Sequence, residues 1–283
     1  MTKKVSYILD TDPWYDPDDL FALQYLLNSG ITPDLIVTGD EVDGKRAKLT
    51  KWFLEQSGNA NINVVAGAEL PGKTHLFCAD LIVGKDYNVS GNVVEEIRKV
   101  VDAADQTVYL GVQGLSNLAK FQRVHPELCD KIILYQMGGS LDLNREKAEH
   151  NIRIDIPAAK QILELGMKTY LVMLDTTFNM DYEINNEHPL YKFCKEKLPA
   201  IAQNVDEFNN ANGNQYWTLM HDPLTVSAAL GHNFVDFYEA KIKMNNNGMM
   251  TVSDEGSKIY LSRPESRAKE FMQHLGEIIK NGN

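Results

Sequence analysis

The chain has few cysteines, no long apolar run and no surplus of basic residues, and each shortage excludes a class of protein. Its 283 residues include three scattered cysteines without metal-ligand spacing, so we expect reduced thiols and no disulfide framework. No apolar run reaches membrane-spanning length, and the apolar stretch in MTKKVSYILD is too short for a signal peptide. We therefore expect a cytoplasmic protein. The formal net charge of −11 argues against binding to nucleic acid or anionic membrane.

Short β-branched runs alternate with helical patterns along most of the chain. The strand candidates are Tyr7–Asp10, Leu35–Thr38, Asn63–Ala66, Thr107–Gly111, Lys131–Tyr135 and Thr169–Leu174. The helix candidates between them are Leu20–Ser29, Lys45–Gln56, Val93–Ala103, Leu115–Val124 and Pro157–Leu165. This rhythm predicts an α/β fold with a mostly parallel, doubly wound sheet and helices on both faces.

The carboxyl-terminal part has a different texture. A helical region from Leu190 to Leu230 is followed by the runs Phe234–Met244, Met249–Ser253 and Ser257–Leu261, which predict an antiparallel hairpin at the sheet edge. A closing helix is expected over Glu265–Lys280. Because no repeat, low-complexity tract or flexible linker interrupts the chain, one domain over residues 1–283 is the simplest expectation.

Five carboxylates crowd into ten residues near the amino terminus: Asp10, Asp12, Asp16, Asp18 and Asp19. An apolar strand precedes them and a helical pattern follows, so they occupy the turn from a strand into a helix, where open α/β sheets bind ligands. So much like charge in one turn is costly unless a cation or its hydrogen-bond equivalent compensates. A solvated acidic loop at a helix start is the plainer alternative.

Other strands also end in small or polar residues, at Val112–Gly114, Met137–Gly139 and Asp175–Thr177. These strand ends would meet at one edge of a parallel sheet. His221 and Asp222 precede Pro223 and an apolar helix, so Asp222 is either a helix cap or a further ligand for a cation.

These motifs resemble the inosine–uridine-preferring nucleoside hydrolase family. The opening DTDPWYDPDD is similar to the family signature D-x-D-P-G-x-D-D with two residues added, and to divergent members that read D-T-D-x-x-x-D-x-D-D. The resemblance continues, in the family's order, through VQGLSNLA, MGGS, AEHNIRIDIPAA, MHDPLTVSAAL and the late NNNGMMTVSD. The resemblance implies calcium-dependent hydrolysis of the N-glycosidic bond of a ribonucleoside, with a role in purine or pyrimidine salvage.

The family pattern implies a Ca²⁺ held by Asp12, Asp19, Asp222 and the backbone carbonyl of Val112. Such a mixture of hard oxygen ligands suits calcium. Asp12 would also be the general base toward the attacking water, and Asp10 would orient these groups from behind. By the same resemblance, His221 would protonate the departing base.

The resemblance also implies contacts with the sugar. Asp18 and Asn151 match positions that bind ribose hydroxyls, and Glu149 matches the acid that reaches the 5′-hydroxyl. Asp43 falls near the position of a family asparagine, where it would add a charge to a sugar contact. Alternatively, Asp43 only decorates a loop.

The sequence departs from the family mainly around the expected base. Trp14 replaces the signature glycine and is either a lid that stacks on the base or a packed turn residue. We expect Asp16 in the lengthened loop to be solvated. His150 replaces a phenylalanine and is either a contact on the 5′ side or a structural histidine. His75 has no assigned role, and Tyr216, Trp217 and Phe178 are candidates either for a stacking wall or for the core. An unusual nucleobase is therefore compatible with the pattern.

Two other functions compete with hydrolysis. A catalytically silent protein of the same fold would bind a ribosyl ligand through Ca²⁺, but it would not need Asp12 as a base. A phosphotransferase of the haloacid dehalogenase type would use the run ILDTD, but Trp14 stands where that family expects Thr or Val. The partner expected from the resemblance is a small-molecule ribonucleoside, with a homodimer or homotetramer as the assembly typical of the family.

Overall fold

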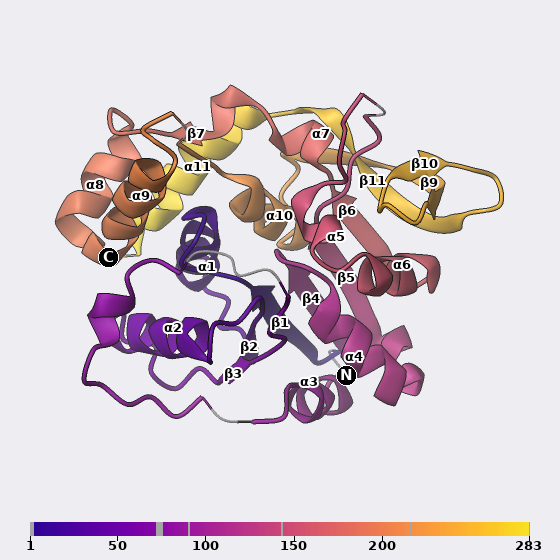
Figure 1. The fold of residues 1–283 in the computed structure, drawn as a ribbon, viewed down its shortest axis with the longest axis horizontal. Helices are drawn as coiled ribbons and strands as arrows, with labels where there is room; N and C mark the ends of the chain where they lie inside the picture. Colours follow the sequence, from indigo (N-terminus) through magenta and orange to yellow (C-terminus); the bar gives the residue numbers. More distant parts are fainter. Residues whose placement is uncertain (1–2, 72–75, 90, 143, 216, 283) are drawn as a thin grey trace.

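A computed structural model describes residues 3–71, 76–89, 91–142, 144–215 and 217–282. Within these ranges nine strands form one sheet (Figure 1). In spatial order they are β10 (Met250–Val252), β9 (Val235–Met244), β11 (Ser257–Ser266), β6 (Thr169–Val172), β5 (Ile132–Met137), β4 (Gln106–Gly111), β1 (Val5–Thr11), β2 (Leu35–Thr38) and β3 (Val64–Ala66). The six strands from β6 to β3 are parallel. The predicted fold class is confirmed.

Helices cover both faces because the strands are apolar on both sides. Leu9 and Leu110 pack into one buried cluster, whereas their neighbours Ile8 and Tyr109 pack into another. The first cluster includes residues of α1 (Asp18–Asn28), α2 (Lys45–Gln56), α8 (Pro189–Lys197), α9 (Pro199–Ala211), α10 (His221–Ala229) and α11 (Ala268–Asn281). The second includes residues of α3 (Val93–Asp102), α4 (Ser116–Val124) and α6 (Ile156–Glu164).

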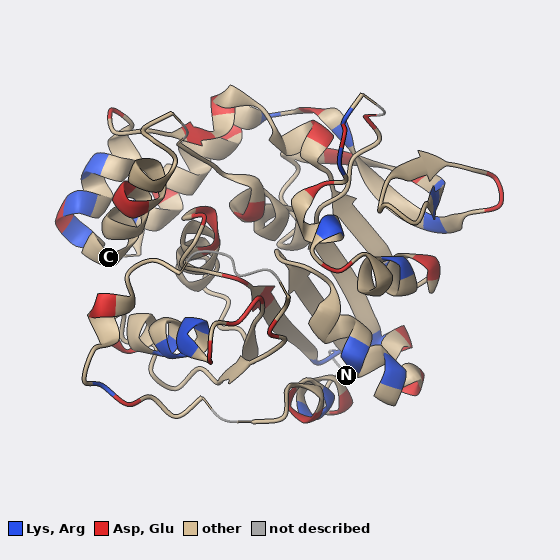
Figure 2. Ribbon diagram, in the orientation of Figure 1, with Lys and Arg blue, Asp and Glu red and all other residues tan. Residues whose placement is uncertain are grey.

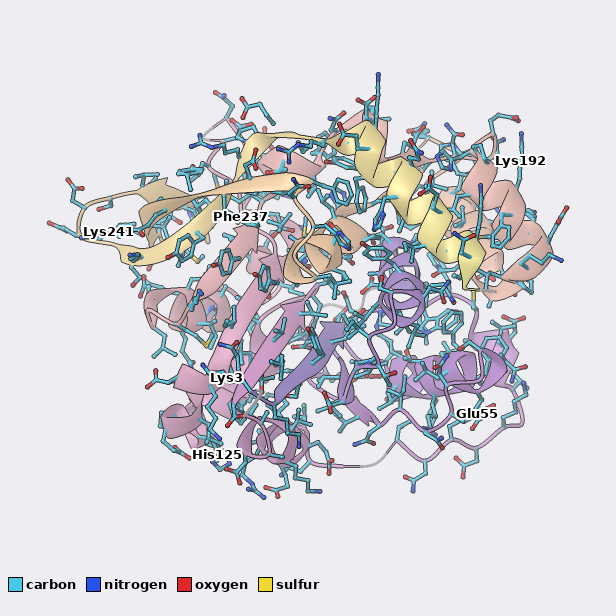
Figure 3. All side chains as sticks on the ribbon, turned by 180° about the vertical axis from the view of Figure 1, so that it is seen from behind. Lys3, Glu55, His125, Lys192, Phe237 and Lys241 are labelled. Carbon is cyan, nitrogen blue, oxygen red and sulfur yellow. The ribbon has the colours of Figure 1, made fainter. Side chains whose placement is uncertain are left out.

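The predicted antiparallel edge is also present. β11 pairs in parallel with β6 and antiparallel with β9, which in turn pairs antiparallel with β10. Seen from behind, Lys241 on this hairpin and Lys192 on α8 mark opposite ends of the molecule (Figure 3).

Several predicted boundaries differ from those observed by two residues or more, and two of them have a clear structural cause. The sixth strand stops at Val172 rather than Leu174, because the chain turns into the short helix α7 (Leu174–Thr177), whose first turn is closed by bonds to the Met173 carbonyl. The last strand continues past Leu261 to Ser266 through an irregularity in its pairing with β9, so the closing helix begins only at Ala268.

Several short elements have no counterpart in the sequence-based expectation. They are η1 (Ala79–Ile82), η2 (Pro126–Lys131), α5 (His150–Arg153), η3 (Met180–Tyr182) and the two-stranded sheet of β7 (Glu183–Ile184) and β8 (Thr218–Leu219). Elements of two to six residues carry too little periodicity to be recognised.

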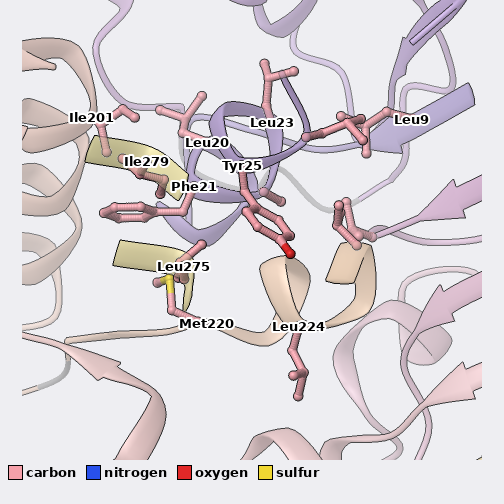
Figure 4. Close-up of a cluster of buried hydrophobic side chains, with 14 of the residues drawn as sticks. Leu9, Leu20, Phe21, Leu23, Tyr25, Ile201, Met220, Leu224, Leu275 and Ile279 are labelled. Atoms are coloured by element: carbon pink, nitrogen blue, oxygen red, sulfur yellow. The ribbon is translucent and has the colours of Figure 1, made fainter. Parts of the chain in front are cut away.

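The helix α1 is held rigidly in the core, and this fixes the acids at its first turn. Leu20, Phe21 and Leu23 of α1 are fully or almost fully buried, together with side chains from α9, α10 and α11 (Figure 4). Within the described ranges, every helix is too short or too polar to cross a bilayer.

The strand order places a topological switch point between β1 and β4. From β1 the parallel sheet grows in one direction through β2 and β3, and from β4 in the other through β5 and β6. Ligands of doubly wound folds bind in the crevice outside the carboxyl ends of the strands at such a point. The acidic turn follows β1 at this point, where Figure 2 shows red segments at the ends of the central strands.

Candidate active site

Asp10 closes β1 as a buried carboxylate with three side-chain donors. The Tyr109 hydroxyl donates to it over 2.6 Å, the Gln113 amide over 2.5 Å and the Asn117 amide over 2.9 Å. Burial raises the pKa of Asp10 to about 7, although these hydrogen bonds act in the opposite direction. Asp10 therefore joins the carboxyl end of β1 to β4 and to the start of α4, and its expected role of orienting the catalytic groups stays a prediction.

Three further carboxylates meet in front of it. Asp18 and Asp19 start α1, Asp222 starts α10, and one oxygen from each lies within 4.8 Å of the others. All three side chains are buried. We call these three residues together with Asp12 the acidic floor.

The acids of the acidic floor repel one another. Burial raises the pKa values of Asp18, Asp19 and Asp222 well above their ordinary value, and neighbouring carboxylates raise them further. An all-oxygen cluster of this kind is the donor set that a hard divalent cation prefers. The described residues therefore fit a metal ion.

Asp12 faces the same cavity and is tied to the cluster through its backbone. Its amide donates to Asp19 over 3.0 Å, and Asp19 also accepts from the Thr11 hydroxyl. Burial raises the pKa of Asp12, while the positive charge of Arg46 acts against this rise. The metal grouping defined by mutual distance consists of Asp18, Asp19 and Asp222, so Asp18, expected as a sugar contact, lies as well placed for a cation as the other two.

Arg46 on α2 is a buried cation that the sequence did not single out. Its guanidinium donates to the carbonyl oxygens of Asp12, over 3.1 Å, and Pro13, and its Nε donates to that of Asp40 over 2.8 Å. It is completely inaccessible to solvent. Arg46 thus holds the start of the lengthened acidic loop through its backbone carbonyl groups. A lone arginine in a surface-type helix pattern gave no signal for this role.

Glu149 and Asn151 come from the opposite side of the crevice. Glu149 accepts hydrogen bonds from the amides of Gly139, at 3.0 Å, and Asn151, at 2.9 Å. The side-chain amide of Asn151 donates to the carbonyl oxygen of Val112 over 3.4 Å. This carbonyl is the backbone group that the sequence predicts as a metal ligand. The structure therefore brings together the predicted residues Glu149, Asn151 and Val112.

His221 precedes Asp222 on α10. Its Nδ1 lies 2.7 Å from the Thr177 hydroxyl of α7. Burial lowers the pKa of His221 to about 4, so the ring is neutral near pH 7. Neutral, it can present a single N–H to a ligand.

Asp12, Asp18, Asp19, Asp222 and His221 open onto one cavity of about 780 Å³, whereas Asp10 and Arg46 lie behind its wall. It is lined by Asp12, Tyr15, Asp16, Asp18, Asp19, Val112, Met137, Arg145, Glu146, Lys147, Ala148, Glu149, His150, Asn151, Arg153, Leu174, Phe178, Phe208, His221 and Asp222. This volume suits a small organic ligand.

Two expected substrate contacts are not at this cavity and are corrected. Trp14 is fully buried against Trp52 and Phe53, with ring centroids 6.3 and 6.1 Å away, so it is a packed turn residue. Its φ of 76° keeps the left-handed conformation that the signature glycine would favour. Asp43 is 78% exposed in its side chain and pairs with Lys45 at 3.9 Å.

The lengthened loop contributes in ways the sequence did not predict. Asp16, expected to be solvated, lines the cavity and accepts a hydrogen bond from the Thr218 hydroxyl over 2.5 Å. Tyr15 also lines the cavity and packs edge-on against Phe208, with centroids 5.6 Å apart. The sequence feature that could have indicated this contribution is the pair of residues added to the acidic motif.

The aromatic residues considered for a stacking wall differ in where the structure places them. Phe178 lines the cavity and is 68% exposed, whereas Trp217 packs against Tyr191 with centroids 6.2 Å apart and does not line it. His150 lines the cavity. His75 and Tyr216 lie outside the described residues.

Comparison with known proteins identifies the family of the chain. The family model described as inosine-uridine preferring nucleoside hydrolase matches residues 7–273. The chain belongs to this family. It is thereby an N-ribosyl hydrolase, as its resemblance predicted.

Curated relatives and solved structures extend the match to most of the chain. A pyrimidine-specific ribonucleoside hydrolase RihA of Salmonella schwarzengrund is 25% identical over 270 residues, which cover 86% of this chain and 85% of the relative. The purine-preferring ribonucleoside hydrolase from Gardnerella vaginalis is 17% identical and superposes with a TM-score of 0.77 over 97% of this chain and 98% of that one.

A second solved structure, the inosine-uridine preferring nucleoside hydrolase from Bacillus anthracis, is 16% identical and has a TM-score of 0.76 over 98% of this chain and 99% of that one. At these identities the structures show the fold. The proteins named here differ in the base they prefer: one is described as pyrimidine-specific and another as purine-preferring.

Proposed function

We propose that the protein, acting as one domain over residues 1–283, hydrolyses a ribonucleoside to ribose and free base with the help of one calcium ion. The observation that carries the proposal is the buried grouping of Asp18, Asp19 and Asp222 beside Asp12, at the switch point of a nucleoside hydrolase fold. Asp12, Asp19, Asp222 and the Val112 carbonyl would hold the ion, with Asp18 within reach. Bound there, calcium supplies a Lewis acid that lowers the pKa of water.

The protein's own side chains divide the remaining work. Asp12 accepts a proton from the attacking water as general base. The carboxylates of the acidic floor stabilise the positive charge that develops on the ribosyl ring as the N-glycosidic bond breaks. Asp18, Asn151 and Glu149 orient the sugar through its hydroxyls, and this positioning lowers the entropic part of the barrier.

His221 meets the departing base as a neutral ring. If its Nδ1 accepts the proton of the Thr177 hydroxyl, its Nε2 carries the N–H that is donated to the base. This assignment makes His221 a hydrogen-bond donor toward the negative charge that builds up on the base. Donating a hydrogen bond does not require His221 to transfer its proton completely.

Product analysis against a panel of purine, pyrimidine and modified ribonucleosides tests the proposal. We expect release of ribose and base in the presence of calcium, loss of turnover after chelation, and recovery when calcium is added back. Turnover that is insensitive to both treatments would remove the metal from the mechanism. Calcium-dependent binding of nucleosides with no base released from any of them would favour the catalytically silent alternative.

A further inference from the structure

Three tyrosine and phenylalanine rings line the cavity, and they differ in how firmly they are held. Phe178 is 68% exposed, whereas Tyr15 is half-buried and Phe208 is almost fully buried. Tyr15 contacts two other rings: its centroid is 5.6 Å from that of Phe208, which meets it edge-on, and 5.7 Å from that of Phe77. We call Tyr15 and Phe208 the aromatic wall.

The backbone that carries Tyr15 is also held from two sides. The side-chain amide of Asn204 on α9 donates to the Tyr15 carbonyl over 3.1 Å, and the Phe77 amide donates to the Trp14 carbonyl over 2.7 Å. Trp14 is fully buried and anchors the lengthened loop in the core, while Tyr15 remains at the cavity. A ring that is already fixed in place can bind a ligand without first being ordered, which lowers the cost of binding.

Two hydrogen bonds join the lengthened loop to the start of α10. The Thr218 hydroxyl donates to Asp16 over 2.5 Å, and the Asp222 amide donates to Asp18 over 3.2 Å. His221 lies between these two attachment points in the sequence, and the tyrosine of the aromatic wall directly precedes the first of them. In the proposed function this histidine meets the departing base, so a bound base comes close to the aromatic wall.

Other apolar residues of the cavity lie where the proposed function places the sugar. The side-chain amide of Asn151 donates to the carbonyl oxygens of Met137, over 3.2 Å, and Val112, over 3.4 Å. Because Asn151 is expected to bind a ribose hydroxyl, these two residues belong to the ribose end of the cavity. Phe178 also offers a ring, but most of it faces solvent, so a base packed on it would bury less apolar surface.

From this arrangement we propose that Tyr15, supplied by the lengthened loop, is the residue against which the nucleobase packs, and that Phe208 holds its ring in position. This inference rests on the proposed function and assigns a specificity-determining residue of the same site. Stacking recognises the flat face of a base rather than its hydrogen-bonding groups, so bases of different identity can be accepted. Burial and the neighbouring Asp16 raise the pKa of Tyr15, so its hydroxyl stays protonated near pH 7.

Binding of two C-nucleosides, pseudouridine and formycin, tests the inference without requiring turnover. A carbon–carbon bond joins their bases to ribose, so there is no N-glycosidic bond to break. Calorimetry in the presence of calcium gives the base ratio, which is the dissociation constant of ribose divided by that of the C-nucleoside. We expect a base ratio of about ten or more for at least one of the two, the size of one stacking contact. A base ratio near one for both would overturn the proposal.

Substitutions of Tyr15 test the residue itself. Tyr15→Leu fills much of the space but has no flat face, so the base ratio should fall about tenfold, whereas Tyr15→Phe keeps the ring and should keep the ratio. Unchanged affinity for ribose shows that each variant retains the fold of the acidic floor. Equal losses of affinity for ribose and for the C-nucleoside in Tyr15→Leu would indicate a purely structural role and overturn the proposal. Tyr238→Ala, in a half-buried tyrosine of β9, is the control and should leave the ratio unchanged.

Two further variants locate the effect within the cavity. Phe178→Ala should leave the base ratio unchanged, and a loss as large as that of Tyr15→Leu would place the base on Phe178 and overturn the assignment. Phe208→Leu should lower the ratio in the otherwise native protein but not further in Tyr15→Leu, because Phe208 acts through the tyrosine ring. Additive losses would contradict that supporting role.

Turnover separates this inference from the proposed function. For uridine and inosine, Tyr15→Leu should raise KM about tenfold and change kcat little, because the base packs on the ring both before and during bond cleavage. Hydrolysis with an unchanged KM would refute the inference alone. A base ratio that depends on Tyr15, with no base released from any nucleoside, would refute the proposed function alone.

Discussion

The cavity is lined by the acidic floor and also by the exposed residues Arg145, Lys147 and Arg153, which we call the basic rim, and the two differ in almost every physical respect. Asp18, Asp19 and Asp222 of the floor are buried and Asp12 is partly buried. The side chains of the floor come from elements far apart in the sequence, and hydrogen bonds such as that from the Asp222 amide to Asp18, 3.2 Å long, hold it in place. The rim is exposed, comes from one short stretch and has almost no internal contacts. The floor is therefore suited to chemistry that demands fixed geometry, whereas few contacts fix the side chains of the rim.

The comparison between floor and rim predicts its largest effect for a substitution of Asp12. Asp12→Ala should lower kcat by about 10³-fold, because a general base typically contributes 10² to 10⁴. Asp43→Ala removes the same charge from a neighbouring loop, and its exposed side chain predicts no change in kcat. Steady-state kinetics on both variants, with circular dichroism to check folding, make the measurement. Full activity of Asp12→Ala would show that the floor does not supply the base.

The same division explains what the sequence could predict. The floor was predictable because its acids stand at strand ends and helix starts, where periodicity reveals both elements and where parallel strands bring distant residues together. The mostly parallel sheet and the edge hairpin followed from the same patterns.

The surroundings of the floor were harder to predict. Trp14 stands in the acidic motif but is drawn into the core, because burying an indole outweighs the cost of a positive φ. Arg46 and Asp16 act through contacts with residues distant in the sequence, as the bond from Thr218 to Asp16 shows. Such contacts arise only from tertiary packing, so no local sequence pattern predicts them.

The next largest effect concerns stability rather than catalysis. Trp14→Ala should lower the free energy of unfolding by about 3–5 kcal/mol, the usual cost of truncating a buried aromatic. Phe178→Ala, which truncates an exposed ring at the cavity, should change it by no more than about 0.5 kcal/mol. Denaturant unfolding measures both. If Trp14→Ala hardly changed the free energy of unfolding but raised KM, Trp14 would be a substrate contact, which would contradict its placement in the core.

His221 stands between floor and wall, and its loss sharpens their division of labour. His221→Ala should slow hydrolysis of nucleosides with poor leaving bases by about 10²-fold, in the range typical of proton donors. The effect on p-nitrophenyl riboside should be much smaller, since p-nitrophenolate departs without help. Thr177→Val, which removes the hydroxyl beside Nδ1, should show the same selectivity in weaker form. Equal losses on both substrates would deny His221 any contact with the departing base.

The smallest effect tests the charge of the floor through pH. The pKa values of Asp18, Asp19 and Asp222 are raised in the folded, metal-free protein, so their contribution to stability is present below the unfolded value of about 3.9 and is lost as pH rises through the raised values. Calcium binds the deprotonated carboxylates and should offset this loss. The rise in Tm on adding calcium should therefore be larger near pH 8 than near pH 5.

The matched variant for this measurement is Asp222→Asn, which keeps the shape of the side chain but cannot lose a proton. Each pKa unit of one carboxylate corresponds to about 1.4 kcal/mol, so removing a single group should visibly flatten the dependence of Tm on pH. Glu187→Gln, an exposed acid of a surface ion pair, should leave that dependence intact. A calcium effect of equal size at both pH values would mean that protons and cation do not compete for the floor, and the acids gathered there would then owe their proximity to hydrogen bonding rather than to a metal.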